Sequence, residues 1–434
     1  MSNHLNVYHG EQLVGRLAMH NSEPFYGFEY DESYLLSDDA MPLSLSLPLE
    51  RRRFTGSEAL PFFEGLLPEG DVRSVVAQQF HVSANSPAQL IRILGRDCAG
   101  DVMVAEEDDP VQPPEQASYL PLPCALESIS ENPGGKVSAL RAAYRLSLAG
   151  GQEKVALYHD GRLSFEEGWY APLDGSPSSH IVKPQANDRF PLLALNEFLC
   201  MRAAAHVGIE AAETTFVPLP NPVLVVRRYD RERGGCSTSD GLAVLKRVHQ
   251  EDFCQALGYS SEEKYEGQKT AHAQRMAQLL LDYAAHPEEA LRELYRLLAF
   301  NYVIGNCDAH LKNYSLMWEN RNSVVLAPAY DLVATTVYDG RFGAELSRSM
   351  GVRIGEHLNI DKVTTKDFEQ LARTFYQSKR AMSDIHEQLA ESIESALDAA
   401  ISDAQELGVE KNATELTNRI MIGVRKRVKV LQGK

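Results

Sequence analysis

The sequence lacks the features that mark several large classes of protein. Its six cysteines form no CxxC pair and no spacing typical of a zinc site or a disulfide framework, which indicates a reduced environment. No run of about 18 apolar residues occurs, and the opening MSNHLNVYHG has neither a basic nor an apolar export region. These absences predict a cytoplasmic protein with no membrane partner.

The sequence also has fewer basic residues than acidic ones. The chain of 434 residues has 43 Lys and Arg against 60 Asp and Glu, a net charge of -17. A protein with this overall field does not coat nucleic acid, so any contact with DNA is local or passes through a partner. The length and the 44% hydrophobic content predict a large core in two or three domains or one bilobed domain.

Hydrophobic periodicity predicts a β-rich half followed by an α-rich half. Residues 5–18 alternate apolar and polar side chains, as two strands joined by a turn do. Helical spacing follows in residues 57–95, where prolines such as Pro61 and Pro87 are expected near helix ends. The acidic, proline-rich residues 106–123 predict a linker with little that packs.

The second half contains the strongest helical pattern. SHIVKP predicts a short strand, LLALNEFLCMRAAAHVG a helix that ends at Gly208, and residues 220–232 a buried strand. Pro287 is placed to begin a helix whose apolar face is expected to carry Leu291, Leu294, Tyr295, Leu298 and Tyr302. A further helix is expected around Phe368, Leu371, Ala372 and Phe375.

The segment NCDAHLKN follows this apolar run and places Asp308 and Asn313 five positions apart, the interval that protein kinases use. Phosphoryl transfer needs a carboxylate to orient and deprotonate the attacking hydroxyl and an amide oxygen to hold Mg²⁺. Asp331, in APAYDL, offers a second carboxylate for a magnesium site. For Asp308 and Asn313, the alternative is a capping Asp and a turn Asn.

Other charged residues also have a structural alternative to a catalytic role. His310 and Lys312 lie in the same loop and either approach phosphates or are a packed histidine and a solvated lysine. Lys183, at the end of the strand HIVK, is expected to aim its ammonium at phosphate oxygens, with Glu197 on the next helix as its ion-pair partner. For each of these two, the alternative is a surface charge.

Residues 147–154, SLAGGQEK, lie between two strand-like runs, and their paired glycines let backbone amides approach an anion. The segment matches neither GxGxxG nor GxxxxGK[ST], so a hairpin turn is the more common explanation of such a sequence.

Taken in order, these residues resemble the HipA family, the kinase toxins of HipBA toxin-antitoxin systems, over nearly the whole chain. The segments that carry the resemblance are PLSLSLPL (42–49), FFEGLLPEG (62–70), GRDCAGDV (95–102), SLAGGQEK (147–154), HIVK (180–183), RRYDR (227–231), HQEDFCQALG (249–258), GNCDAHLKN (305–313) and AYD (329–331).

The resemblance implies a role for each matching residue. Asp308 is implied as the catalytic base, Asn313 and Asp331 as the Mg²⁺ ligands, and Ser147 as an autophosphorylated serine that switches ATP binding. Where the family commonly has Glu, this chain has Arg227, which leaves backbone contacts to adenine in place and puts the side-chain environment in doubt. The implied ATP contacts are Ala149, Gly150, Gly151, Gln152, Glu153, Lys154, Lys183, Arg227, Arg228, Tyr229, His310, Leu311, Lys312, Asn313, Tyr330 and Asp331.

The resemblance also implies partners and an architecture. The partners are a HipB-like helix-turn-helix antitoxin dimer, operator DNA mainly through that antitoxin, and a protein substrate of the translation machinery, glutamyl-tRNA synthetase in the best-known member. Direct DNA contact by the basic triplets 51–53 and 425–427 competes with ordinary solvated charge. The implied cofactors are ATP and Mg²⁺.

The expected fold is α+β, a bilobed protein-kinase-like fold. Its parts are an N-terminal α+β subdomain (1–105), a linker (106–123), a β-rich ATP-binding lobe (124–245) and a helical catalytic C-terminal lobe (246–434). Two alternatives stay open: a pseudokinase that acts as a DNA-bound co-repressor with the antitoxin, and the same fold used for nucleotidylation or for phosphorylation of a lipid headgroup.

Overall fold

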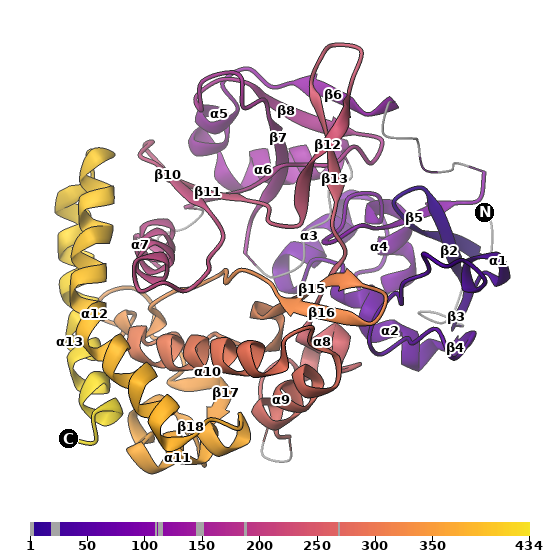
Figure 1. The fold of residues 1–434 in the computed structure, drawn as a ribbon. Helices are drawn as coiled ribbons and strands as arrows, with labels where there is room; N and C mark the ends of the chain where they lie inside the picture. The colour runs from indigo at the N-terminus through magenta and orange to yellow at the C-terminus, as the bar shows by residue number, and fades with distance from the viewer. Residues whose placement is uncertain are drawn as a thin grey trace. The chain divides into compact units, whose positions relative to one another are not determined.

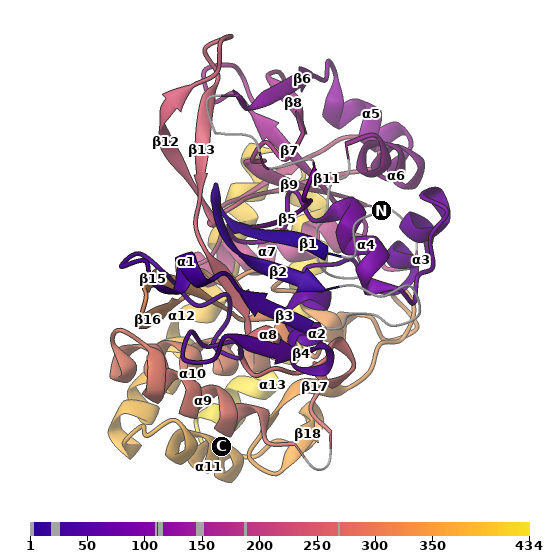
Figure 2. The ribbon, with the colours of Figure 1, turned by 90° about the vertical axis from the view of Figure 1, so that its right-hand side faces the viewer.

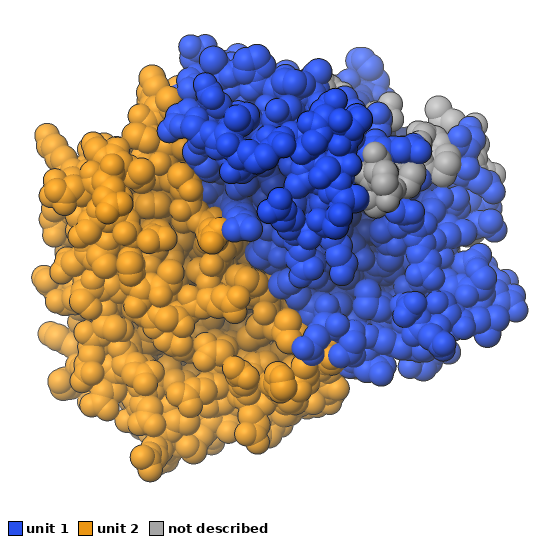
Figure 3. All heavy atoms as spheres, turned by 45° about the horizontal axis from the view of Figure 1, so that its top comes forward, with its two compact units in different colours: residues 1–184, 225–261, 317–322 blue, residues 185–224, 262–316, 323–434 orange. Residues whose placement is uncertain are grey.

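The computed structural model describes residues 4–18, 27–108, 111, 116–144, 152–185, 189–267 and 270–434. The chain forms two compact units, coloured separately in Figure 3. Each unit is assembled from segments that are distant in the sequence. Unit 1 comprises Met1–Pro184, Val225–Ser261 and Met317–Asn322, and unit 2 comprises Gln185–Leu224, Glu262–Leu316 and Ser323–Lys434.

Unit 1 begins with an antiparallel sheet in the order β4-β3-β2-β1-β5 (Figure 2). Val7 lies opposite Gly15 on one side and Val104 on the other. Apolar side chains of the sheet pack with the helices that follow it, and Phe62 and Phe63 are fully buried in this core. The elements are β1 (His4–His9), β2 (Gln12–Ala18), β3 (Gly27–Tyr30), α1 (Glu32–Leu35), β4 (Arg53–Thr55), α2 (Gly56–Gly65), α3 (Gly70–Gln79), α4 (Pro87–Leu94) and β5 (Val102–Glu106).

A second sheet of unit 1 contains the neighbouring strands β11-β9-β7-β8-β6 (Figure 2). In the antiparallel ladder of β7 and β9, Val155 lies opposite Val182. The next residues along the chain at this end of the ladder are Lys154, directly before β7, and Lys183, in β9. The elements are β6 (Ser118–Pro121), α5 (Ala125–Glu131), α6 (Pro133–Tyr144), β7 (Val155–His159), β8 (Trp169–Leu173), β9 (His180–Pro184) and the part of β11 (Val223–Arg227) that belongs to this unit.

The rest of unit 1 links these two sheets. Strands β12 and β13 form an antiparallel ribbon in which Arg231 lies opposite Arg247. Helix α8 begins at a capping box made by Asp252 and Gln255, which satisfies two amide groups of its first turn. The elements are β12 (Arg231–Ser237), β13 (Ala243–Arg247), β14 (Gln250–Asp252), α8 (Phe253–Ala256) and the part of β15 (Ser315–Asn320) that belongs to this unit.

Unit 2 is mainly helical. Its longest helices, α12 and α13, lie beside each other in both ribbon views (Figures 1 and 2), and Arg202 of α7 donates to Asp403 of α12 at 2.6 Å. Within unit 2 the elements are α7 (Leu193–His206), β10 (Thr214–Val217), α9 (His272–Tyr283), α10 (Pro287–Ile304), η3 (Leu311–Asn313), β16 (Ser323–Leu326), η4 (Thr335–Val337), β17 (Ser349–Ile354), β18 (His357–Asn359), η5 (Ile360–Lys362), α11 (Thr365–Thr374), α12 (Lys379–Glu406) and α13 (Glu410–Leu431); η2 (Ser261–Glu263) lies at the boundary.

Most of the expected elements are confirmed. The hairpin of β1 and β2, the strand β9, the helix α7 and the helix α10 with Pro287 in its first turn all occur where periodicity predicted them. The five expected apolar positions of α10 are buried. In the part of the chain that the structure describes, none of the helices is long and apolar enough to cross a membrane.

Two local expectations differ from the structure. Pro61 lies inside α2 rather than at its end, because the capping box of Thr55 and Glu58 starts the helix earlier. Within the predicted linker, Ser118–Pro121 form β6 and pair with β8, so Tyr119 lies opposite Pro172. The four-part division at residues 105, 123 and 245 stays a prediction.

Candidate functional site

The predicted catalytic loop begins where α10 ends. Gly305 caps this helix with a left-handed backbone, φ 82°, a conformation that glycine adopts at low cost. The hydroxyl of Thr335 accepts from the amide of Cys307 at 2.8 Å and donates to the Gly305 carbonyl at 3.1 Å. The start of the loop is therefore fixed by a rigid helix on one side and by η4 on the other.

Asp308 is exposed at the tip of this loop, and its backbone is held by several groups. Its amide donates to Oδ1 of Asn306 at 3.1 Å, and its carbonyl accepts from the amide of His310 at 2.8 Å. The Tyr265 hydroxyl donates to Oδ1 of Asp308 at 2.5 Å. The carboxylate is thus oriented by a hydroxyl group, the same kind of donor that a serine or threonine substrate would present.

Asp331 lies on a strained segment. Its φ is 54°, a left-handed value that non-glycine residues rarely adopt and that is enriched at functional sites. The preceding residues are held by hydrogen bonds from the amide of Ala212 to the Ala329 carbonyl at 2.9 Å and from the amide of Ala329 to the Glu210 carbonyl at 2.8 Å. This anchoring allows the strained backbone at Asp331 to persist.

Asn306 connects the two segments. This buried residue donates from Nδ2 to Oδ1 of Asn301 at 2.9 Å and to the Asp331 carbonyl at 3.4 Å, while its own Oδ1 accepts from the Asp308 amide. One side chain thereby links α10, the Asp308 loop and the Asp331 segment. Sequence pattern assigned no role to Asn306, because its contact with the Asp331 carbonyl joins residues that are distant in the chain.

Asn313 completes a set of oxygen donors in unit 2. Its Nδ2 lies 3.4 Å from the Asp308 carbonyl, an arrangement that orients the amide and leaves Oδ1 as a ligand atom. Mg²⁺ prefers a few hard oxygen ligands from the protein, with water and phosphate oxygens for the rest. Asn313 and Asp331 supply such oxygens and Asp308 lies on the adjoining loop, so the donor set fits Mg²⁺.

The other residues of this loop that were predicted to contact ATP are mostly buried within the protein. His310 meets the ring of Tyr265 edge to face, with centroids 4.9 Å apart, and Leu311 is fully buried. Lys312 is only 7% exposed, so the interpretation of a solvated charge is wrong. The Tyr330 hydroxyl donates to the Lys312 carbonyl at 2.7 Å, which joins the loop to the segment before Asp331.

In unit 1, two lysines are predicted phosphate contacts: Lys154, directly before β7, and Lys183, in β9. Lys154 is 7% exposed and Lys183 is 4% exposed, so Lys183 is not a surface charge. Both side chains are therefore held within the fold rather than extended into solvent. Gln152 and Glu153 are half-buried beside them, whereas Ser147, Ala149, Gly150 and Gly151 lie outside the described residues.

Glu197 belongs to unit 2 and is 1% exposed, so the surface interpretation is wrong for this residue as well. Its pairing with Lys183 of unit 1 stays a prediction.

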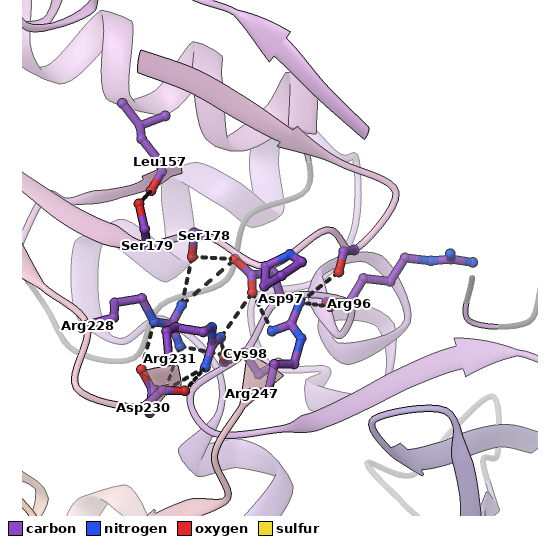
Figure 4. Close-up of polar contacts among 12 residues, drawn as sticks. Arg96, Asp97, Cys98, Leu157, Ser178, Ser179, Arg228, Asp230, Arg231 and Arg247 are labelled. Carbon is purple, nitrogen blue, oxygen red and sulfur yellow. Dashed lines mark hydrogen bonds and ion pairs between the residues drawn. The ribbon is translucent and has the colours of Figure 1, made fainter. Parts of the chain in front are cut away.

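The three predicted ATP contacts of the RRYDR segment differ in their surroundings, and the backbone of two of them, Arg227 and Tyr229, is the predicted adenine contact. Arg227 is exposed, and the Tyr229 hydroxyl donates to Oε1 of Gln250 at 2.5 Å. The Arg228 side chain is buried and points into an ionic cluster (Figure 4), where its Nη2 donates to Asp230 at 2.7 Å. The backbone amide of Arg228 donates to the Ser179 carbonyl at 3.0 Å. Arg228 therefore has its side chain and its amide committed within unit 1.

We define the arginine cluster as Asp97, Arg228, Asp230, Arg231 and Arg247, which all lie within unit 1. Burial opposes ionisation of the two carboxyl groups, yet the arginines keep the pKa of Asp97 and that of Asp230 well below their ordinary value. Burial and the neighbouring Arg228 lower the pKa of Arg231 to about 10. The cluster ties the segment between α4 and β5 to the residues after β11 and to the ribbon of β12 and β13.

The arginines of the two basic triplets, residues 51–53 and 425–427, already have partners within the protein. Arg51 pairs with Glu58, Arg52 with Glu29 and Glu32, and Arg53 with Glu29, all at exposed positions. Arg425 pairs with Glu394, whereas Arg427 is buried and donates to the Val303 carbonyl at 2.9 Å. Arg427 therefore cannot contact DNA.

Two family models of known proteins match this chain. A family model of the HipA N-terminal domain matches residues 5–105, and one of the HipA-like C-terminal domain matches residues 146–397. The protein Y4mE of Sinorhizobium fredii (strain NBRC 101917 / NGR234) is 35% identical over 376 residues, 85% of each chain. The serine/threonine-protein kinase toxin HipA of Shewanella oneidensis is 28% identical over 347 residues, 77% of this chain and 76% of the relative.

A solved structure shares the architecture. The HipA chain of Shewanella oneidensis MR-1, solved in complex with HipB and its operator DNA, superposes with a TM-score of 0.77 at 24% identity. The match covers 99% of this chain and 100% of that chain. This likeness confirms the expected α+β fold of the kinase-like type.

Proposed function

Because the chain belongs to the HipA family of serine/threonine-protein kinase toxins, we propose that it transfers the γ-phosphoryl group of ATP to a serine or threonine hydroxyl of a protein. The observation that carries this proposal is Asn306, which holds the Asp308 loop and the Asp331 segment together within unit 2. Asp308 accepts the proton of the hydroxyl as its oxygen attacks the γ-phosphorus, and ADP leaves.

The nucleotide contacts follow from the same assignment. Asn313 and Asp331 hold Mg²⁺, which when bound neutralises charge on the phosphates. Lys154 and Lys183 contact phosphate oxygens, in keeping with their positions beside β7 and in β9, and Glu197 orients Lys183. The further contacts proposed are residues 149–153, Arg227, Arg228, Tyr229, His310, Leu311, Lys312 and Tyr330. Arg228 can contribute only its backbone carbonyl, because its side chain and its amide already bind other groups of unit 1.

The biological role proposed is that of a toxin that arrests growth. Its substrate is a component of the translation machinery, with glutamyl-tRNA synthetase as the first candidate. Phosphoproteomics after brief induction tests this: enrichment of one translation protein supports it, and a phosphorylation pattern without any such protein contradicts it.

Two forms of control accompany this role. Autophosphorylation at Ser147 adds a dianionic phosphate beside the proposed ATP loop and removes ATP affinity. A HipB-like antitoxin dimer binds the protein and takes it to operator DNA. Any direct DNA contact involves exposed residues such as those at 51–53, which have acidic partners that DNA would have to displace.

Incubation of the purified protein with labelled ATP and Mg²⁺ tests the activity, with intact-mass analysis to separate added phosphate from added AMP. We expect phosphate on protein that disappears in Asp308→Asn and persists in Asp282→Asn, a control at an exposed aspartate of α9. Transfer of AMP would favour nucleotidylation. Absence of any incorporation, with antitoxin-dependent DNA binding retained, would favour the co-repressor alternative.

A further inference from the structure

Three ligand-type side chains that have no part in the proposed nucleotide site meet inside unit 1. His9 ends β1, Asp101 precedes β5, and His249 precedes β14. Nδ1 of His9 and Nδ1 of His249 lie 2.8 and 2.9 Å from Oδ1 of Asp101. All three ligand atoms lie within 4.8 Å of one another, and each residue is buried.

The surroundings fix the histidine rings. The His249 ring stacks on Trp318 with centroids 5.7 Å apart, and the His9 ring stacks on Tyr34 at 6.2 Å. The two histidine rings meet edge to face at 4.5 Å. The three side chains are therefore pre-arranged by packing, which is what a binding site needs from its supporting residues.

The hydrogen bonding of His249 indicates why the three atoms converge. Nε2 of His249 lies 3.1 Å from the Leu43 carbonyl, which can only accept, so Nε2 carries a proton. In the neutral ring, Nδ1 then carries a lone pair and faces the carboxylate of Asp101. The 2.9 Å approach of these atoms also lacks the direction of a hydrogen bond. A cation held between Nδ1 of His249 and Oδ1 of Asp101 would satisfy both of these acceptor atoms.

A bound cation accounts for these features together. Histidines that ligate a metal commonly donate their other N–H to a backbone carbonyl, as Nε2 of His249 does to Leu43. Two imidazole nitrogens and one carboxylate oxygen suit divalent first-row transition metals rather than Mg²⁺ or Ca²⁺. We propose that His9, Asp101 and His249 bind one divalent transition-metal ion, with Zn²⁺ as the probe, and that this ion ties the N-terminal sheet to the segment before β14.

Metal binding to the full-length protein tests the proposal directly. The protein is dialysed against a chelator, equilibrated with buffered micromolar Zn²⁺ and analysed by mass spectrometry for bound zinc. We expect one ion per chain in the wild type and loss of that ion in Asp101→Asn and His249→Gln. His206→Gln is the control, because His206 pairs with Asp403 at 2.9 Å on the exposed side of α7 and should retain the ion.

A second measurement leaves all three ligands intact, so it stands even where a variant fails to fold. In a Trp169→Phe background, Trp318 is the remaining tryptophan and stacks on His249. We expect Co²⁺ to quench its fluorescence saturably at one equivalent and Zn²⁺ to reverse the quenching. Wild-type protein that binds no zinc at micromolar concentration, zinc retained by a folded Asp101→Asn variant, or quenching that never saturates would overturn the proposal.

Discussion

Replacement of Asp97 by asparagine should be among the most damaging single changes in unit 1. Asp97 accepts from Nη1 of Arg247 at 2.6 Å, from Nη2 of Arg231 at 3.2 Å and from the Ser178 hydroxyl at 2.8 Å (Figure 4). The arginine cluster has three guanidinium groups and two carboxylates. Asp97→Asn leaves Asp230 as the cluster's one carboxylate among three buried cations.

The size of the effect follows from this imbalance. Removal of one partner from a buried ion pair leaves an uncompensated charge and costs about 3–5 kcal/mol. Domains of this kind have a total unfolding free energy of about 5–15 kcal/mol, so the variant should be close to unfolding at ambient temperature. The double variant Asp97→Asn/Arg247→Met should recover part of this loss, because it removes one of the unpaired cations.

Denaturant unfolding followed by tryptophan fluorescence measures this loss selectively. The only two tryptophans of the sequence, Trp169 and Trp318, both belong to unit 1. The control is Glu32→Gln, which removes a pair with Arg52 on a side chain that is 74% exposed and should leave the midpoint unchanged. An Asp97→Asn midpoint equal to that of Glu32→Gln would refute the argument that this buried charge is needed.

Three further predictions concern the catalytic loop and the response to acid. Asn306→Ala should lower the rate constant of phosphoryl transfer roughly 100-fold, with a smaller effect on KM for ATP, because Asn306 positions other groups; an unchanged rate would contradict this. Tyr265→Phe frees Asp308 of a competing hydroxyl and should lower KM for the protein substrate without loss of the maximal rate. Burial lowers the pKa of His180 to about 3 from 6.5, so the unfolded state takes up a proton first as the pH falls, and unit 1 should lose about 2 kcal/mol between pH 6.5 and pH 5. His180→Asn should flatten this pH dependence, as measured by denaturant midpoints at each pH.

The sequence predicts those parts of the fold that depend on local pattern. Helix α10 and the loop after it follow from Pro287, an apolar face and a glycine at the end of the helix, and all of these signals lie within a few residues of the structure they determine. The prediction from Pro61 was wrong because the capping box of Thr55 and Glu58 decides where α2 starts. Local sequence pattern thus predicts the existence of a helix or strand more reliably than the residues at which it begins and ends.

The supporting contacts of the site are beyond local pattern. Asn306 reaches the carbonyl of Asp331, and Arg228 reaches Cys98 and shares a cluster with Asp97, both in the N-terminal part of the chain. No spacing rule relates such residues, since the fold alone brings them together. The resemblance named RRYDR as an adenine contact, whereas the buried partners of Arg228 became visible only with the fold.

A crystal structure of the full-length protein with a non-hydrolysable ATP analogue and Mn²⁺ tests the central claim most directly. We predict an anomalous Mn²⁺ peak about 2.1 Å from Oδ1 of Asn313 and from a carboxylate oxygen of Asp331, with the phosphates against Lys183 and the γ-phosphate facing Asp308. A nucleotide bound without contact to these four residues would contradict the account.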